Sequence, residues 1–204
     1  MKIYAILDLG YVSVENITGV ATELCAGGVD LLQLRAKNHT DDEILQMAKI
    51  ARPICTKHGI PFIVNDYPHV AAMVNADGIH LGQDDGDLVN ARRDAGNCSL
   101  VGRSTHSIEQ AEKAQAEGAD YIGFGPLHAT ATKPGRPAIG LQDIAEVYRR
   151  VSIPVYCIGG INLQNLAAVT AAGAENAVIV SDLLQSHDIS SYIQRARNIL
   201  AGTN

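Results

Sequence analysis

Eight short apolar runs recur along the chain of 204 residues, and amphipathic stretches lie between them. The runs cover residues 3–7, 31–34, 61–64, 78–81, 100–102, 121–124, 154–158 and 177–180. Helical spacing is clearest in residues 41–58, where one face collects Ile44, Leu45, Met47, Ala48 and Ala51. Continuous apolar strands that alternate with helices predict a parallel sheet covered on both faces. Eight such units predict an α/β fold, a (β/α)8 TIM barrel that forms a single compact domain over residues 1–204.

A short motif repeats four times and supports this fold. The copies are Gly28-Val29-Asp30, Asn75-Ala76-Asp77, Gly118-Ala119-Asp120 and Gly173-Ala174-Glu175. Each follows a helix-like segment, where Gly or Asn supplies the left-handed residue that ends a helix. The copies lead into the second, fourth, sixth and eighth strands, so the repeating unit is β-α-β-α, a quarter of a barrel. An open doubly wound sheet would not explain the fourfold repeat, and no GxGxxG motif follows the first strand.

Charge and composition exclude several classes of partner. Lys and Arg number 16 against 22 Asp and Glu, and a net charge of −6 suits a nucleic-acid backbone poorly. No apolar stretch approaches the ~18 residues that span a bilayer, and Asp8 comes too early for a signal peptide. Four scattered cysteines never form CxxC and indicate reduced thiols in a cytoplasmic protein. We therefore expect a cytoplasmic protein with no nucleic-acid or membrane partner. A homo-oligomer is compatible with the sequence, which does not determine the oligomeric state.

Polar residues or glycines follow every predicted strand from the second to the eighth. In chain order these are Gln33, Arg35 and Lys37; Asn65 and Asp66; Gln83, Asp84 and Asp85; Arg103, Ser104 and His106; Thr130, Thr132 and Lys133; Gly159 and Gly160; and Ser181. The active site of a parallel barrel lies at the carboxyl ends of its strands. We therefore expect these clusters to meet in one site.

The residue types at the second, third and fourth strands indicate a diphosphate site with a metal. Asp66 and Asp85 suit a hard cation such as Mg²⁺, which shares its coordination shell with phosphate oxygens. Arg35 and Lys37 supply the matching positive charge, Arg as a planar fork and Lys as a point charge.

The last two strands indicate a second anion site. Backbone N–H groups at Gly159-Gly160 and at the Val180-Ser181 turn suit a single phosphate. One diphosphate with its metal and one monophosphate imply two phosphorylated substrates. The sequence therefore predicts group transfer with diphosphate as the leaving group.

Each of these residues taken alone also has a structural interpretation. The basic pair suits a solvated rim, Asp66 could cap the next helix, and Asp84 and Asp87 are typical turn and cap residues. His106 near a helix start is more often structural. No pair with ligand spacing occurs among the remaining histidines, which we interpret as structural: His39, His58, His69, His80, His128 and His187. The joint pattern favours function.

Eight motifs in order resemble the thiamine-phosphate synthase family over nearly the whole chain. They are QLRAK at 33–37, VND at 64–66, ADGIHLGQDD at 76–85, GRSTH at 102–106, GFGP at 123–126, TATK at 130–133, IGGI at 158–161 and VS at 180–181. The resemblance implies a TIM barrel that joins 4-amino-2-methyl-5-hydroxymethylpyrimidine diphosphate to hydroxyethylthiazole phosphate, plain or carboxylated. The products would be thiamine phosphate and diphosphate.

The resemblance also implies roles for individual residues. It places Mg²⁺ on Asp66 and Asp85. It places the pyrimidine diphosphate on Gln33, Arg35, Lys37 and Asn65, with Ser104 and Lys133 near the reacting centre, and the thiazole phosphate on Thr130, Thr132, Gly160, Val180 and Ser181. The bond to diphosphate would break largely before the thiazole nitrogen attacks. The catalytic set implied by the resemblance is Ser104, Lys133, Arg35 and Lys37.

Two segments depart from the family pattern, and two other functions remain open. Leu127-His128-Ala129 stands where the family usually has an aromatic-Pro pair, and the first strand reads Ala5-Ile6-Leu7-Asp8-Leu9. One alternative is a thiazole tautomerase, an isomerase on the same barrel that uses a His at the position of His106 for proton transfer. The other is a non-catalytic phosphate-binding regulator. Neither needs a metal pair, so the paired acids favour the synthase.

Overall fold

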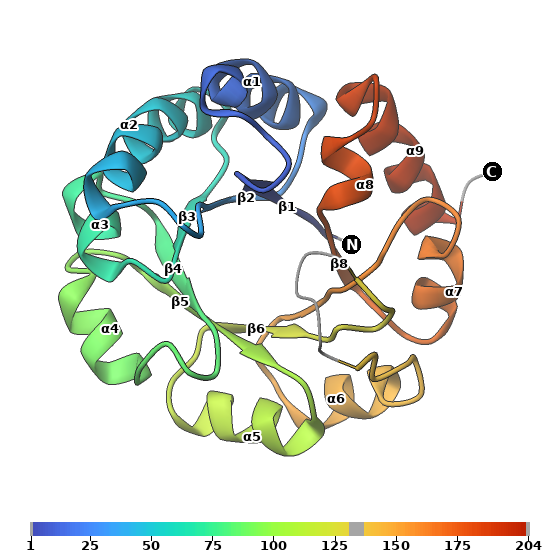
Figure 1. Cartoon of the computed structure of the whole chain (residues 1–204). Coiled ribbons are helices and arrows are strands. Elements are labelled where there is room, and N and C mark those ends of the chain that lie inside the picture. The colour runs from blue at the N-terminus through green and yellow to red at the C-terminus, as the bar shows by residue number, and fades with distance from the viewer. Residues whose placement is uncertain (1, 131–136, 203–204) are drawn as a thin grey trace.

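A computed structural model describes residues 2–130 and 137–202 of the chain. Within them, parallel strands follow one another in sequence order around a closed barrel, and β8 pairs back onto β1. The strands are β1 (Lys2–Asp8), β2 (Leu31–Arg35), β3 (Phe62–Asn65), β4 (Gly78–Leu81), β5 (Leu100–Thr105), β6 (Tyr121–Phe124), β7 (Val155–Cys157) and β8 (Asn176–Ile179). Figure 1 shows them at the centre of a ring of helices. The predicted (β/α)8 fold is confirmed.

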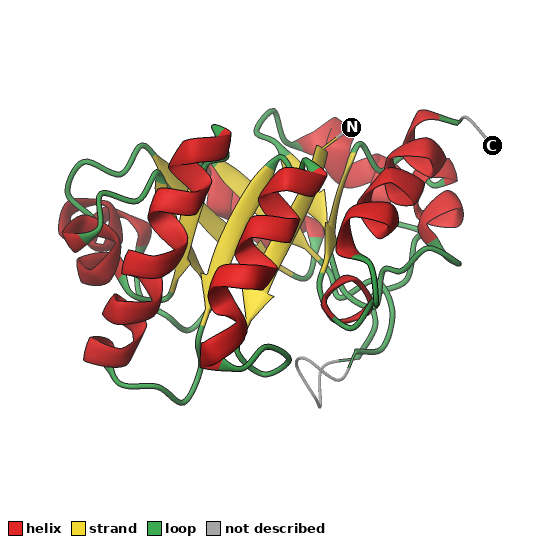
Figure 2. Cartoon of the chain, turned by 90° about the horizontal axis from the view of Figure 1, so that it is seen from above, coloured by secondary structure: helices red, strands yellow, loops and turns green. Residues whose placement is uncertain are grey.

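Helices cover the outer face of the barrel, as the side view in Figure 2 shows. They are η1 (Val14–Asn16), α1 (Ile17–Gly27), α2 (Asp41–His58), α3 (Pro68–Met73), α4 (Leu88–Asp94), α5 (Ile108–Ala116), α6 (Ile144–Arg150), α7 (Leu166–Ala171), α8 (Ser181–Leu184) and α9 (Ile189–Ala201). Helix α2 has the predicted bounds because a capping box between Thr40 and Glu43 begins it and left-handed Gly59 ends it. None of the helices in the described ranges is long and apolar enough to cross a membrane.

Strand β5 is longer than its apolar run predicts. It continues beyond Gly102 to Thr105, pairing Ser104 with Gly123 and Thr105 with Phe124 of β6. Arg103 and Ser104 therefore lie within a strand and point to opposite faces of the sheet, rather than sharing a loop. The residues after Gly102 are polar, so the apolar run does not mark the true end of the strand.

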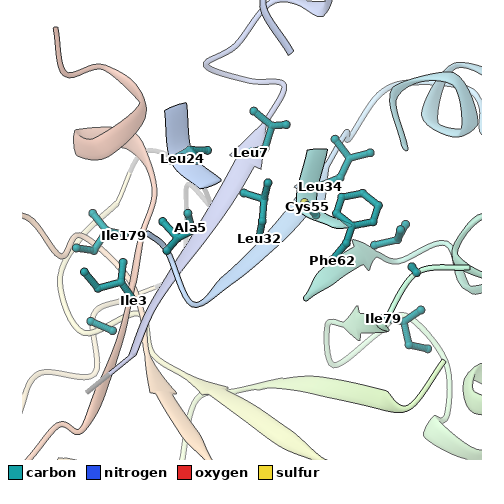
Figure 3. Packing of buried hydrophobic residues seen from close by; sticks show 14 of the residues in the cluster. Ile3, Ala5, Leu7, Leu24, Leu32, Leu34, Cys55, Phe62, Ile79 and Ile179 are labelled. Carbon is teal, nitrogen blue, oxygen red and sulfur yellow. The ribbon is translucent and has the colours of Figure 1, made fainter. Parts of the chain in front are cut away.

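Alternate residues of the strands fill two separate apolar layers. Ile3, Ala5 and Leu7 of β1 point outward, where they pack with residues such as Leu24 of α1 (Figure 3). The barrel interior holds a smaller cluster of Tyr4, Ile6, Leu31, Ile63, Tyr121, Tyr156 and Val178. Because both strand faces are buried, the strands appear in the sequence as continuous apolar runs.

The fourfold motif lies at the amino-terminal rim of the barrel. Its first residues all have positive φ, as predicted for left-handed helix ends: Gly28 (87°), Asn75 (49°), Gly118 (89°) and Gly173 (105°).

The four cysteines are buried and free, in agreement with the sequence analysis.

The acids of the first three copies hold this rim together. Each Oδ2 accepts a strand N–H and pairs with a helix arginine: Asp30 with Ile3 (2.7 Å) and Arg197 (2.9 Å), Asp77 with Phe62 (2.7 Å) and Arg52 (2.6 Å), and Asp120 with Val101 (2.7 Å) and Arg92 (2.7 Å). In the fourth copy, the backbone N–H of Glu175 donates to the Tyr148 hydroxyl instead (2.9 Å). In three of its four copies, the repeat thus places a carboxylate that connects the first residues of an odd-numbered strand to an outer helix.

Replacement of Asp77 tests this role. We expect Asp77→Ala to lower the free energy of unfolding by about 1–3 kcal/mol, because it removes the acceptor for the Phe62 N–H and the partner of Arg52. Urea unfolding with an unchanged slope would measure it. The control is Asp94→Ala, which removes a half-exposed acid paired with its neighbour Arg93 and should change stability by less than about 0.5 kcal/mol. Equal losses in both variants would contradict the interpretation.

Candidate active site

A cavity opens among the carboxyl ends of the strands. It holds about 790 Å³ of empty space, part of it open to solvent. Its wall contains ten of the residues predicted from the sequence: Gln33, Arg35, Asn65, Ser104, His106, Thr130, Gly159, Gly160, Val180 and Ser181. These residues come from six different strand ends, so the structure brings together what the barrel hypothesis placed at one rim.

Arg35 reaches the cavity with its guanidinium held by an acid on the neighbouring strand. Its Nη1 lies 2.7 Å from Oδ2 of Asp8, and the register of β1 and β2 places the two residues directly opposite each other. Asp8 is 1% exposed, and its second oxygen accepts from the Gly10 N–H (2.9 Å). A carboxylate with both oxygens engaged holds the arginine fork in one orientation at the wall.

Lys37, Asp66 and Asp85 gather beside this wall. Lys37 Nζ lies 2.6 Å from Oδ2 of Asp66, whose side chain is 11% exposed. Burial raises the pKa of Asp66, Lys37 opposes that shift, and the nearby Asp85 carboxylate adds to it. Burial by itself would lower the pKa of Lys37, but Asp66 and Asp85 outweigh it and raise that pKa. Asp66 therefore lies close both to the Lys37 ammonium and to the Asp85 carboxylate.

Asp66 adopts a backbone conformation that is rare for a residue with a side chain. Its φ is 65°, in the left-handed region, and its N–H donates to the His80 carbonyl on β4 (2.9 Å). Tyr67, not Asp66, occupies the N-cap of α3, and no side chain caps that helix. The capping interpretation of Asp66 is thus wrong, whereas Asp87 does cap α4 through the Asn90 N–H (2.8 Å).

The loop that carries Asp85 is fastened from outside the barrel by Arg103. Arg103 is 5% exposed, and its guanidinium donates to the carbonyls of Gly82 (2.5 Å) and Gly86 (2.7 Å). Asp85 Oδ2 also accepts from the Gly82 N–H (2.9 Å). The sequence placed Arg103 among the residues of the site, but it points away from the cavity and holds the loop instead.

The opposite side of the cavity is formed by tight backbone turns. Gly159 and Gly160 have φ of 102° and 63°, and Val180-Ser181 begins the short helix α8. A Cβ on Gly160 would lie 2.8 Å from the carbonyl oxygen of Ala129. Leu127 is buried and its N–H donates to the Ile158 carbonyl (2.8 Å). The Leu127-His128-Ala129 segment thus packs directly on the glycine turn, which explains why a small residue is needed there.

Two predicted site residues fall where no placement is given. Thr132 and Lys133 lie outside the described residues, between positions 130 and 137. Within the described ranges, no group of three or more His, Cys, Asp or Glu side chains is placed to hold a metal ion. Asp66 and Asp85 remain a pair of carboxylates without a third protein ligand of these types there.

Sequence reasoning does not identify Asp8 and His80 as polar residues of the cavity wall. It uses Asp8 only to exclude a signal peptide and as part of an unusual first strand, and it interprets His80 as structural. His80 lines the cavity, and its Nε2 lies 3.0 Å from Ser104 Oγ. Strand periodicity could have found it: in Gly78-Ile79-His80-Leu81 the polar residue alternates with outward-facing Ile79 and Leu81, so it must face the interior.

Comparisons with known proteins agree with this geometry. A family model described as thiamine monophosphate synthase matches residues 3–183. A thiamine-phosphate synthase of Prochlorococcus marinus (strain MIT 9313) is 45% identical over 161 residues, covering 79% of this chain and 46% of that protein. One from Persephonella marina is 37% identical over 200 residues, covering 98% of this chain and 96% of the relative. The chain spans about half the length of the first of these relatives and nearly all of the second.

Solved structures show the same relationship. A thiamine phosphate pyrophosphorylase from Pyrococcus furiosus superimposes with a TM-score of 0.87 at 30% identity, covering 98% of this chain and 96% of that one. A 3-hexulose-6-phosphate synthase, at 17% identity and a TM-score of 0.71, shares the fold alone.

The role assigned to Arg103 can be tested by hydrogen exchange. We expect Arg103→Ala to speed backbone exchange in residues 82–87 by about tenfold or more, because that loop loses two hydrogen bonds to a buried cation. Arg93→Ala removes an arginine whose side chain is 71% exposed and should leave this loop unchanged. Mass spectrometry of peptides covering the loop would measure both. Unaltered protection in Arg103→Ala would contradict the assignment.

Proposed function

The chain belongs to the thiamine monophosphate synthase family, and we propose that it is a transferase that makes thiamine phosphate. The proposed substrates are 4-amino-2-methyl-5-hydroxymethylpyrimidine diphosphate and hydroxyethylthiazole phosphate, plain or carboxylated. The bond to diphosphate would break largely before the thiazole nitrogen attacks and forms the new carbon–nitrogen bond. One observation supports the proposal above the others: Asp66 and Asp85 lie with Lys37 beside a cavity whose wall contains Arg35 and, from other strand ends, the Gly159-Gly160 and Val180-Ser181 turns.

The pair Asp66 and Asp85 fits the Mg²⁺ that the proposed function needs. A buried acid close to a second acid is disfavoured in its charged form, and a divalent cation held by the two carboxylates would relieve this repulsion. Mg²⁺ commonly takes one or two carboxylates and fills its remaining positions with water and phosphate oxygens. We propose that Asp66 and Asp85 hold the ion, which would neutralise charge on the departing diphosphate.

The residues of the chain would bind and orient the pyrimidine diphosphate. Arg35, held by Asp8, presents its fork to phosphate oxygens without further ordering, and Lys37 adds a point charge beside Asp66. Gln33, Asn65 and Ser104 line the same wall and supply hydrogen-bonding groups for the ring. Lys133 and Thr132 enter this proposal through the family resemblance alone.

The thiazole phosphate would occupy the opposite side. Gly160, Val180 and Ser181 line the cavity there, and N–H groups at such a turn bind a phosphate without a charged side chain. Thr130 lies on the same side of the wall. Two anchored phosphates would hold the two rings face to face, so much of the catalysis would come from orientation and from charge stabilisation of the leaving group.

Release of diphosphate is the direct test. Both phosphorylated heterocycles are mixed with the protein and Mg²⁺, with and without EDTA, and diphosphate and thiamine phosphate are measured. The synthase makes both products and loses them in EDTA. A thiazole tautomerase would act on the thiazole alone with EDTA present, and a regulator would bind without turnover. Either of these results would reject the proposal.

Asp66→Ala tests the metal assignment. We expect more than about a 100-fold loss of Mg²⁺-dependent diphosphate release with the fold intact by circular dichroism, because one of two acidic ligands is gone. Asp41→Ala is the matched control, since it removes a largely exposed carboxylate at the start of α2. It should keep near wild-type activity. Near wild-type activity of Asp66→Ala would refute the assignment.

Ser181→Asp tests the monophosphate site. A carboxylate at the first residue of α8 repels the substrate phosphate, so we expect the thiazole phosphate Kd to rise by about tenfold or more. Calorimetry with the thiazole phosphate measures this directly. Ser191→Asp adds the same charge at an exposed position on α9 and should leave the Kd unchanged. Unaltered affinity in Ser181→Asp would remove this residue from the site.

A further inference from the structure

A chain of polar side chains crosses the barrel interior beneath the cavity. Gln33 Nε2 lies 2.6 Å from the Tyr4 hydroxyl, which lies 3.0 Å from that of Tyr121. The Tyr121 hydroxyl lies 3.2 Å from His80 Nδ1, and His80 Nε2 lies 3.0 Å from Ser104 Oγ. Every member except Ser104 is buried. Polar groups in such a place need a consistent pattern of donors and acceptors.

The first member gives the chain a direction. An amide nitrogen can only donate, so Gln33 donates to the Tyr4 oxygen. A buried hydroxyl needs an acceptor for its single hydrogen, so we infer that Tyr4 donates to Tyr121 and that Tyr121 donates to His80 Nδ1. A histidine that accepts at Nδ1 carries its hydrogen on Nε2, and this hydrogen points at Ser104. Ser104 therefore accepts from His80 and keeps its own hydrogen for another acceptor.

The two tyrosines are held in their donor form. Burial raises the pKa of Tyr4. The pKa of Tyr121 is also raised, mainly by burial and to a smaller extent by the neighbouring Tyr4. Both hydroxyls therefore stay protonated well above neutral pH. They can relay hydrogen bonds but do not supply a charge.

The strand between His80 and Tyr121 leaves space for their contact. Register pairs His80 with Gly102 and Gly102 with Tyr121, so the glycine separates the two side chains in the sheet. A Cβ on Gly102 would lie 2.5 Å from the Tyr121 hydroxyl and 2.6 Å from His80 Nδ1. Only glycine lets Tyr121 reach across β5 to His80, and this space is a feature independent of the hydrogen bonds.

We propose that His80 is a positioning residue for Ser104, held by Tyr121 as the neutral Nε2–H tautomer so that the Ser104 hydroxyl directs its hydrogen into the cavity. This rests on the proposed function, in which Ser104 meets the pyrimidine substrate. The Ser104 hydroxyl would then act as an oriented donor to a nitrogen or oxygen of that substrate. Tyr121 does not line the cavity, and its hydroxyl contacts His80 on one side and Tyr4 on the other, so it would influence Ser104 through His80.

The tautomer can be measured without any turnover. Protein labelled with ¹⁵N-histidine is observed by long-range ¹H–¹⁵N correlation, and the signals missing from His80→Asn identify His80. We expect the neutral Nε2–H form in the wild type and a loss of this single tautomer in Tyr121→Phe and Gly102→Ala. An Nδ1–H tautomer in the wild type would overturn the proposal, whatever the activity measurements give.

Turnover gives a second, independent measurement. Tyr121→Phe should lower kcat for diphosphate release roughly three- to tenfold, the size of one hydrogen bond, with a smaller change in KM for the pyrimidine diphosphate. In a Ser104→Ala background the same change should have almost no effect, because the group that it orients is absent. An equal loss in both backgrounds would mean a general structural effect and would reject the positioning role.

Tyr156→Phe is the matched control. Tyr156 is buried in the same aromatic cluster, with its ring 5.3 Å from that of Tyr4 and 5.6 Å from that of Tyr121, but it is not a member of the chain. It should keep the His80 tautomer and near wild-type kcat. If even the wild type releases no diphosphate, the proposed function fails, and the tautomer measurement still decides the role of Tyr121 and His80.

Discussion

The unbroken parallel register around the barrel is the constraint on which the other features depend. Because every strand runs the same way and pairs with both neighbours, each carboxyl end arrives at one rim and each amino end at the other. Register also decides which side chains become partners. Asp8 on β1 lies directly opposite Arg35 on β2. Gly102 on β5 lies between His80 on β4 and Tyr121 on β6. These contacts come from pairing between strands, not from nearness in the sequence.

Much of the architecture follows from the sequence because it depends on repetition. A strand buried on both faces must be apolar throughout, so the runs mark the strands, and the tripeptide repeat marks the helix ends. The apolar runs do not give the end of a strand where polar residues continue its pairing with the neighbouring strand. The extension of β5 through Ser104 to Thr105 shows this, because a hydrogen bond from Thr105 to Gly123 (2.9 Å) satisfies a buried polar group that apolarity could not reveal.

The site was predictable to the level of the rim and not beyond it. Asp66 and Asp85 could be predicted to lie together because they follow neighbouring strands, whose carboxyl ends lie side by side. The direction of Arg103 could not be inferred in the same way, since it depends on where β5 ends, whereas the alternation along β4 does indicate that His80 faces inward. Arg103 looks like a rim cation in the sequence, but it lies inside β5 and faces outward. His80 looks like a core residue, but it lies on the inner face of β4 and lines the cavity.

The three carboxylate ties at the amino-terminal rim have a consequence for how such a chain can change over time. They join strand starts to α2, α4 and α9 at the end of the barrel opposite the cavity. Mutations that reshape the wall of the cavity therefore leave these three carboxylate ties unchanged. Related proteins with this fold can therefore change their chemistry through substitutions at the carboxyl ends of the strands. Such substitutions lower stability at that end only, while the hydrogen bonds and ion pairs at the amino-terminal rim continue to stabilise the barrel.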